Sequence, residues 1–270
     1  MKGEISTLRL AQAVRCSALR MVHRAQASHI GSALSIADIL AVLYGGVLRY
    51  ESARPQSHSR DRFILSKGHA CVVVYATLAE VGVIPPEELI TFGEDFSFLM
   101  SHISHKVPGV EYSAGSLGHG LSFGVGKALM AQRRGESWST YVLLGDGEMD
   151  EGSNWEALMF ASHHRISNLV AVIDANKLQS LTSVSQTLRL EPLVDKLTAF
   201  GCDVSSVDGH DHASLTEALL RRSADRPRVI VAHTVKGKGV SFMENSIDWH
   251  YRSPNDAQLV AALDELERAN

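Results

Sequence analysis

Two short and almost entirely apolar runs, residues 140–144 and 169–174, flank a segment with helical periodicity, residues 152–164. A short continuous apolar run suits a strand that is buried on both faces, as strands of a parallel sheet are. Neighbouring parallel strands are joined by a crossover, usually a helix of about this length. The pattern therefore predicts a βαβ unit in the middle of the chain.

The alternation of strands and helices extends beyond this unit. Residues 202–207, 213–222 and 229–235 repeat the strand–helix–strand rhythm, and residues 62–65 are a further strand candidate. Apolar residues at helical spacing predict helices over residues 6–26, 35–48, 68–83, 116–134 and 256–268. No linker, low-complexity segment or repeat interrupts the pattern. We predict one α/β domain over residues 1–270, with a doubly wound, mostly parallel sheet and helices on both faces.

Local signals refine the helices and the loop between them. Ser35 is a candidate N-cap for the helix over residues 35–48. Residues 92–110 have no periodicity and are expected to form a loop. The helix over residues 116–134 contains four glycines, which are costly in a helix and predict close packing against another backbone: Gly118, Gly120, Gly124 and Gly126.

Composition excludes several classes of function. The formal net charge is −4 and the pI is near 6.3, so no basic surface for nucleic acid or an anionic membrane is expected. Three widely spaced cysteines predict neither a disulfide framework nor a cysteine metal site. Residues 1–10 lack the apolar core of a signal peptide, and no apolar run is long enough for a membrane span. A cytoplasmic protein is the simplest expectation.

A candidate metal site follows from the two central strands. Asp146, in a Gly-Asp-Gly sequence, and Asn176 each follow a strand end and are thirty residues apart. Ligands of parallel sheets bind beyond the carboxyl ends of the strands, so these side chains are expected to be neighbours. Their oxygens, with the backbone carbonyl of Leu178, suit Mg²⁺, or Ca²⁺ or Mn²⁺ in its place. Gly147 would let a phosphate approach a helix N-terminus.

At this point the sequence resembles a known family. The segment from Gly145 resembles the thiamine diphosphate fingerprint in the form that transketolases use, and it reads GDGEMDEGSNWEALMFASHHRISNLVAVIDANKLQ. Four further segments resemble transketolase segments in the same order: HIGSALSIADIL, ILSKGHA, SHISHKVPGVEYSAGSLGHGLS and TVKGKGVSFMENSIDWH. The resemblance covers nearly the whole chain and implies the thiamine diphosphate-binding fold, with the whole chain as its diphosphate-binding domain.

The resemblance assigns roles to individual residues. It implies that four histidines line the channel above the thiazolium ring: His29, His69, His102 and His250. His69 and His250 would also touch the diphosphate, and His29 and His250 would steer substrate oxygens. The implied cofactor contacts further include Gly115, Ser116, Leu117, Asp146, Gly147, Glu148 and Asn176. Imidazoles suit this chemistry because they donate and accept protons near neutral pH.

Acidic residues follow the Gly-Asp-Gly sequence. Glu148 and Asp150 open a helix, where negative charge meets the positive end of the helix dipole. By resemblance, Glu151 and Glu156 match acidic positions at the interface between the two active sites of a transketolase dimer, and we count them with the catalytic residues.

The other histidines are expected to be structural or surface residues: His23, His58, His105, His163, His164, His212 and His233. His210, in the DGHD turn, stays between a structural and a functional interpretation. Asp211 in the same turn is a candidate cap of the following helix.

Some positions depart from the family pattern. His29 and His102 are followed by isoleucine where the family commonly has proline, and Ser116 and His119 stand where many full-length members have proline and glutamine. These differences leave the donor and acceptor sugars open, and with them the pathway.

The resemblance also implies a missing part. Transketolases place a glutamate against the aminopyrimidine ring from a separate pyrimidine-binding domain, and only thirty residues follow Val240. We therefore expect a partner polypeptide, a C-terminal transketolase subunit, in an α2β2 assembly. The predicted reaction is transfer of a two-carbon ketol unit from a ketose, or its phosphate, to an aldose. Three alternatives stay open: a deoxyxylulose phosphate synthase-like subunit, an α subunit of a 2-oxoacid dehydrogenase, and a subunit that binds cofactor without turnover.

Overall fold

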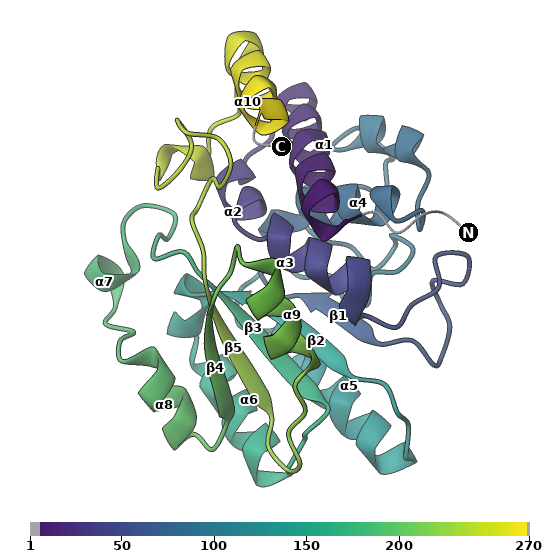
Figure 1. Ribbon diagram of the computed structural model, residues 1–270, viewed down its shortest axis with the longest axis vertical. Coiled ribbons are helices and arrows are strands. Elements are labelled where there is room, and N and C mark those ends of the chain that lie inside the picture. The colour runs from purple at the N-terminus through teal and green to yellow at the C-terminus, as the bar shows by residue number, and fades with distance from the viewer. Residues whose placement is uncertain (1–5, 269–270) are drawn as a thin grey trace.

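A five-stranded, entirely parallel sheet organises the molecule. The computed structural model describes residues 6–268, and in it the strands follow the order β1-β2-β3-β5-β4 (Figure 1). The strands are β1 (Arg62–Leu65), β2 (Thr140–Gly145), β3 (Leu169–Ala175), β4 (Asp203–Asp208) and β5 (Arg228–His233). All four pairings are parallel. The predicted α/β fold class and each predicted strand are confirmed.

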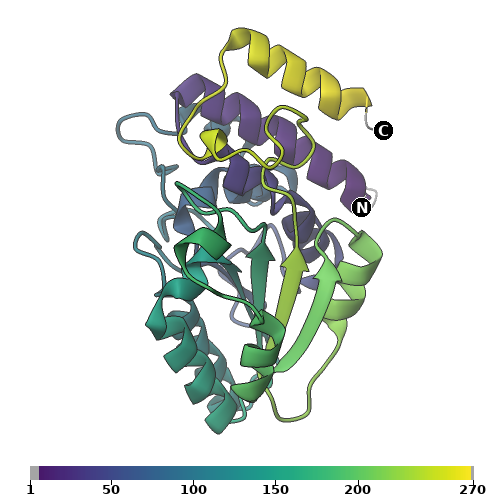
Figure 2. The same ribbon diagram turned by 90° about the vertical axis from the view of Figure 1, so that its left-hand side faces the viewer.

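Helices cover both faces of this sheet (Figure 2). On one face lie α1 (Thr7–Ala25), α3 (Ala37–Val42), α4 (Cys71–Glu80) and α9 (His212–Leu220). On the other lie α5 (Gly120–Arg134), α6 (Gly152–His163) and α8 (Leu193–Ala199). The last helix, α10 (Asp256–Arg268), packs on the outside of α1. The remaining helical pieces are α2 (Ile30–Leu34), η1 (Leu43–Val47), η2 (Gly68–Ala70), η3 (Pro86–Thr91), η4 (Gly147–Asp150), α7 (Val184–Thr187) and η5 (Asp248–His250).

The period of two along a strand explains the two cores. In β2, Tyr141 and Leu143 pack into the core with α1 and α4, whereas Val142 and Leu144 pack into the core with α5 and α6. Side chains of successive strand residues point to opposite faces, so a strand that is apolar at every position fills both cores. This burial fixes the level of the strand ends, where the polar residues begin.

The first helical region differs from its prediction. The helix expected to begin at Ser35 begins instead at Ile30, immediately after His29 in a left-handed conformation (φ 75°). Ser35 lies at the end of α2 and is not an N-cap, because its hydroxyl donates to the carbonyl of Ser32 (3.0 Å) and to Asp174 (2.7 Å). The short helices α7 and α8 were not predicted, since their sequences carry little periodicity.

The glycines of α5 have different reasons. The helix begins at Gly120, so Gly118 precedes it and has a φ of 82°. A Cβ on Gly120 would lie 2.7 Å from the Cα of Ser66, and a Cβ on Gly124 would lie 2.4 Å from Cγ2 of Val142. Close packing therefore explains these two glycines. It does not explain Gly126, where a Cβ would meet nothing within 4 Å.

No helix among residues 6–268 is both long and apolar enough to cross a membrane. The segment over residues 1–10, predicted to lack a signal-peptide core, lies partly outside the described residues.

Candidate active site

Asp146 and Asp174 meet where β2 and β3 end. The backbone amide of Asp146 donates to the carbonyl oxygen of Asp174 (3.1 Å), which places the two residues side by side. The carboxylate of Asp146 accepts from the amides of Gly147 (2.8 Å) and Lys177 (2.5 Å). Both aspartates are buried. The register of the parallel strands thus brings together residues that are far apart in sequence.

Asn176 completes the predicted set of oxygen ligands. Its Oδ1 accepts from the amide of Leu178 (3.1 Å) and its Nδ2 donates to Asp174 (2.8 Å), so its side chain is held in one orientation. Asp146, Asn176 and Leu178 line one cavity of about 260 Å³. Among residues 6–268 no group of three His, Cys, Asp or Glu side chains forms a metal site. A cation here therefore depends on amide and carbonyl oxygens besides the one carboxylate.

The electrostatics of Asp146 fit such a cation. Burial, and then the neighbouring charge of Asp174, raise the pKa of Asp146 to about 7. A carboxylate with a raised pKa gains from a nearby cation, because the cation stabilises its charged form. Asp174 is compensated already: although its burial opposes ionisation, Lys67 holds the pKa of Asp174 below its ordinary value.

Two buried lysines border the same cavity, and the sequence analysis did not single them out. Lys67 donates to Asp174 (2.6 Å) and to the carbonyl of Ser32 (3.0 Å). Lys236 lies 2.9 Å from the carbonyl oxygen of Gln179, 3.4 Å from that of Leu178 and 3.1 Å from Nδ1 of His250. Burial, with Lys67 nearby, lowers the pKa of Lys236 to about 8. Each lysine follows a strand end within two or three residues, which is the sequence signal that would have found it.

The four predicted histidines come together beside this cavity. The ring centroid of His29 is 5.0 Å from those of His69 and His250 and 6.0 Å from that of His102. They come from the α1–α2 junction, η2, the loop after η3, and η5, so no two belong to one element. The structure therefore unites all four residues.

The histidine rings are held in the neutral form. Burial, His102 and Lys236 lower the pKa of His29 to about 4. Burial and Lys236 lower the pKa of His250 to about 3, and burial lowers the pKa of His69 well below its ordinary value. Neutral imidazoles each offer one donor and one acceptor nitrogen.

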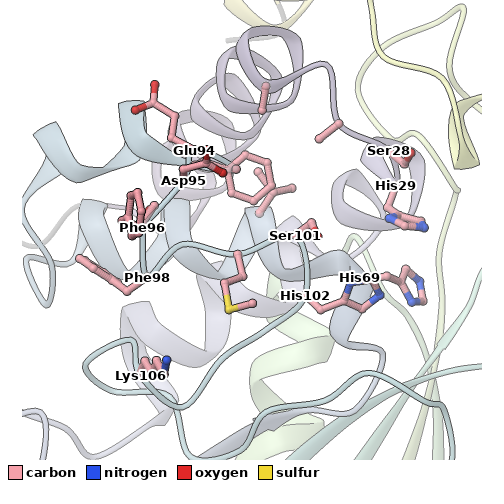
Figure 3. Close-up of a pocket in the computed structure, with 17 residues that line it drawn as sticks. Ser28, His29, His69, Glu94, Asp95, Phe96, Phe98, Ser101, His102 and Lys106 are labelled. Atoms are coloured by element: carbon pink, nitrogen blue, oxygen red, sulfur yellow. The ribbon is translucent and has the colours of Figure 1, made fainter.

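A larger pocket of about 820 Å³ opens on the other side of His29, His69 and His102 (Figure 3). One side is polar, with Ser28 and Ser101 beside the histidines. The segment over residues 92–100 supplies apolar side chains, and Lys106 lies at the end away from the histidines. The predicted loop over residues 92–110 is thus the wall of this pocket, after the short helix η3.

A comparison with known proteins identifies the family. A family model described as "Transketolase, thiamine diphosphate binding domain" matches residues 6–266 of the chain. The chain belongs to this transketolase family. The family and the fold predicted from the sequence are therefore confirmed.

The similar transketolase proteins include single subunits. A protein of Phocaeicola vulgatus that is named as the first of the lettered subunits of an apulose-4-phosphate transketolase is 40% identical over 268 residues, covering 97% of this chain and 95% of the relative. The "6-deoxy-6-sulfo-D-fructose transketolase subunit SqwG" of Clostridium sp. (strain MSTE9) is 38% identical over 261 residues, covering 96% and 95%.

Solved transketolase structures have the same fold. The structure from Campylobacter jejuni matches with a TM-score of 0.91 at 28% identity, covering 97% of this chain and 43% of its own. That from Leishmania mexicana matches with a TM-score of 0.90 at 30% identity, covering 97% and 41%. This chain spans less than half the length of these solved transketolases.

The loop that precedes α5 carries the other residues for which transketolases imply cofactor contacts. Leu117 lines the cavity with Asp146, whereas Gly115 and Ser116 are exposed next to it. Close approach fixes this loop, because a Cβ on Gly68 would lie 2.2 Å from the carbonyl oxygen of Ala114.

The acidic residues after the Gly-Asp-Gly sequence separate into two environments. Glu148 is buried, and its carboxylate accepts from Ser66 (2.5 Å) and from the amides of Gly118 (3.0 Å) and Gly145 (3.2 Å). Its carboxylate therefore ties the loop to the strand ends, and burial raises its pKa. Glu151 and Glu156 are exposed at the start of α6, away from the histidine cluster, and their interface role stays a prediction.

Proposed function

We propose that this chain is the diphosphate-binding subunit of a split transketolase, acting as a single domain. With a partner subunit it would transfer a two-carbon ketol unit from a ketose, or its phosphate, to an aldose. The observation that carries the proposal is the meeting of four neutral histidines beside the cavity of Asp146 and Asn176. The relatives confirm the prediction of a transketolase-type transferase subunit, since two of them are themselves named as transketolase subunits.

The cavity suits the diphosphate and a divalent cation. Asp146, Asn176 and the carbonyl of Leu178 would hold Mg²⁺, and the buried ammonium groups of Lys67 and Lys236 would balance the negative charge of the diphosphate. Gly147, Glu148 and the residues Gly115, Ser116 and Leu117 would border it. When bound, thiamine diphosphate supplies the electron sink at its thiazolium carbon.

The histidines would handle the sugar. His29, His102 and His250 can each donate to one hydroxyl and accept from another, because their rings are neutral. His69, the most enclosed of those facing both spaces, would contact the diphosphate side. We place the rest of the sugar chain in the pocket of Figure 3, where Lys106 offers a cation to an anionic tail.

The aminopyrimidine ring calls for a partner. We propose that this partner is a pyrimidine-domain subunit, in an α2β2 assembly in the cytoplasm, with Glu151 and Glu156 near the interface between two copies of this chain. Relatives whose names describe them as one lettered subunit of a transketolase support a second polypeptide.

The test is a calorimetric titration of thiamine diphosphate with Mg²⁺ into the complex of this chain and its partner. We expect Asp146→Asn to weaken the Mg²⁺-dependent binding by about a hundredfold or more, because it removes the one carboxylate that faces the cavity. The matched control is Asp203→Asn, a carboxylate at the opposite end of the sheet, which should bind as the unaltered protein does. Unchanged, EDTA-sensitive binding by Asp146→Asn would disprove the metal site.

A further inference from the structure

A second buried carboxylate, Asp38 in α3, gathers three cationic or imidazole side chains. Arg15 donates to both of its oxygens (3.0 and 2.6 Å). Nδ1 of His210 lies 2.6 Å from Oδ2, and Nε2 of His212 lies 3.1 Å from Oδ1. None of the four residues lines the cavity of Asp146. The cluster joins α1, α3 and the turn between β4 and α9.

Two of these side chains continue to the segment that carries Lys236. Nε2 of His210 accepts a hydrogen bond from the backbone amide of Val235 (2.9 Å). Nε of Arg15 donates to the carbonyl oxygen of Lys238 (3.1 Å). The backbone is thus held on both sides of Lys236 by groups that are themselves fixed to Asp38.

The hydrogen bonds determine the state of the His210 ring. Because Nε2 accepts from an amide N–H, the ring proton must be on Nδ1, where it is donated to Asp38. The carboxylate therefore selects the tautomer that can receive the Val235 amide. Asp211, in the same turn, caps α9 as predicted, by accepting from the amide of Ala213 (3.0 Å).

The position of Lys236 matters because its ammonium group reaches two parts of the site. Its Nζ contacts the carbonyl oxygens of Leu178 and Gln179 and the ring of His250. A lysine side chain has four rotatable bonds, so its head is placed only if its backbone is fixed.

We propose that Asp38, through His210 and Arg15, is a positioning network for Lys236 and thereby for the diphosphate of the cofactor. This inference rests on the proposed function, because Lys236 is assigned there to the diphosphate. His210 is then a positioning residue, which settles the interpretation that the sequence left open. His212 shares the carboxylate but makes no hydrogen bond to the Lys236 segment, and its other nitrogen contacts Thr7 (2.8 Å).

His210 and His212 therefore form a matched pair. Their side chains are 14% and 11% exposed and both contact Asp38, so His210→Phe and His212→Phe should lower the melting temperature by similar amounts. We expect His210→Phe to weaken the binding of thiamine diphosphate with Mg²⁺ to the complex with the partner subunit by about tenfold, as loss of a buried hydrogen bond does. His212→Phe should leave that affinity unchanged. Equal affinities for the two variants would overturn the proposal.

A milder variant covers the case in which His210→Phe does not fold. In His210→Asn the amide occupies the place of Nδ1 and keeps a donor for Asp38, but nothing replaces Nε2. In His210→Gln an amide reaches the place of Nε2 and restores an acceptor for Val235. Weak binding by the asparagine variant with recovery in the glutamine variant is the expected result, and tight binding by both contradicts the proposal.

Hydrogen exchange separates this inference from the proposed function. The amide of Val235 should be protected in the cofactor-free chain and in His212→Phe, and it should exchange faster in His210→Asn. If the unaltered complex binds no thiamine diphosphate, the proposed function fails. If it binds, but Val235 exchanges equally in all variants, only the positioning network fails.

Discussion

At the scale of single residues, the site combines groups whose charges are set by burial. His29 lies among three other imidazoles, and no ion pair of its own stabilises a proton on its ring in the part of the chain that the structure describes. Asp146 is the opposite case, a carboxylate whose pKa is raised to about 7. A site that keeps both groups near neutrality has low electrostatic strain before a charged ligand enters.

The pKa of His29 predicts how stability depends on pH. The unfolded chain takes up a proton on this ring below a pH of about 6.5, whereas the folded chain does so only near 4. Stability is therefore lost as the pH falls from 6.5 towards 4. We expect the melting temperature of His29→Asn to fall less over this range, by about 2–4 °C for each kcal/mol that is relieved.

Melting curves between pH 7.5 and pH 4 measure this difference. His58→Asn is the control, because His58 is exposed and distant in sequence from the cluster. The explanation fails if His29→Asn loses as much stability as the unaltered protein over the same interval.

At the scale of elements, the packing of α5 against β2 and β1 positions the cofactor loop. Gly120 fits against Ser66 at the end of β1, and Gly124 fits against Val142 of β2. The approach of this helix determines where the preceding Leu117 enters the cavity. Gly126, on the same helix, meets nothing and serves as an internal comparison.

Two alanine substitutions in α5 should have opposite signs. Gly124→Ala should lower the free energy of unfolding by about 1–3 kcal/mol, because its Cβ would overlap a buried, β-branched side chain. Gly126→Ala should raise it by about 0.5–1 kcal/mol, because alanine is the better helix former and no atom opposes its Cβ. Urea denaturation of both variants measures the two values. Stabilisation by both would show that α5 does not pack closely at Gly124.

At the scale of the whole molecule, α6 presents an uncovered apolar surface. Met159 is 57% exposed and Phe160 is 44% exposed, on the helix that also carries the exposed Glu156. This helix lies at the end of the molecule opposite α10 (Figure 1). Exposed apolar groups next to acidic residues fit the proposed contact between two copies of this chain.

The surface predicts the effect of one added charge. Met159→Glu should reduce self-association of the complex by about tenfold or more, because an unpaired charge in an interface costs more than about 1.4 kcal/mol. Analytical ultracentrifugation of the complex measures it. Val260→Glu is the control, since Val260 is 62% exposed on the distant α10. An unaltered association for Met159→Glu would place the interface elsewhere.

The sequence predicted what local patterns encode. The strands were evident because a parallel strand buried on both faces is apolar at every position, as in β2 and β3. Asp146, Asn176 and the four histidines were found because each stands in a short motif or directly after a strand. Their spatial meeting followed from the rule that parallel strands end at one edge of the sheet.

Only the tertiary structure decided which polar residues are buried and what they contact. Lysines usually lie at the surface, so nothing local marked Lys67 and Lys236 as buried. The start of α2 at Ile30 depended on the left-handed conformation of His29, whose backbone amide is held by the carbonyl of His250 (2.7 Å), far along the chain. The contact of Asp38 with His210 likewise joins residues from separate elements. Periodicity and motifs describe a residue's neighbours in sequence, whereas burial and charge pairing depend on neighbours that only folding supplies.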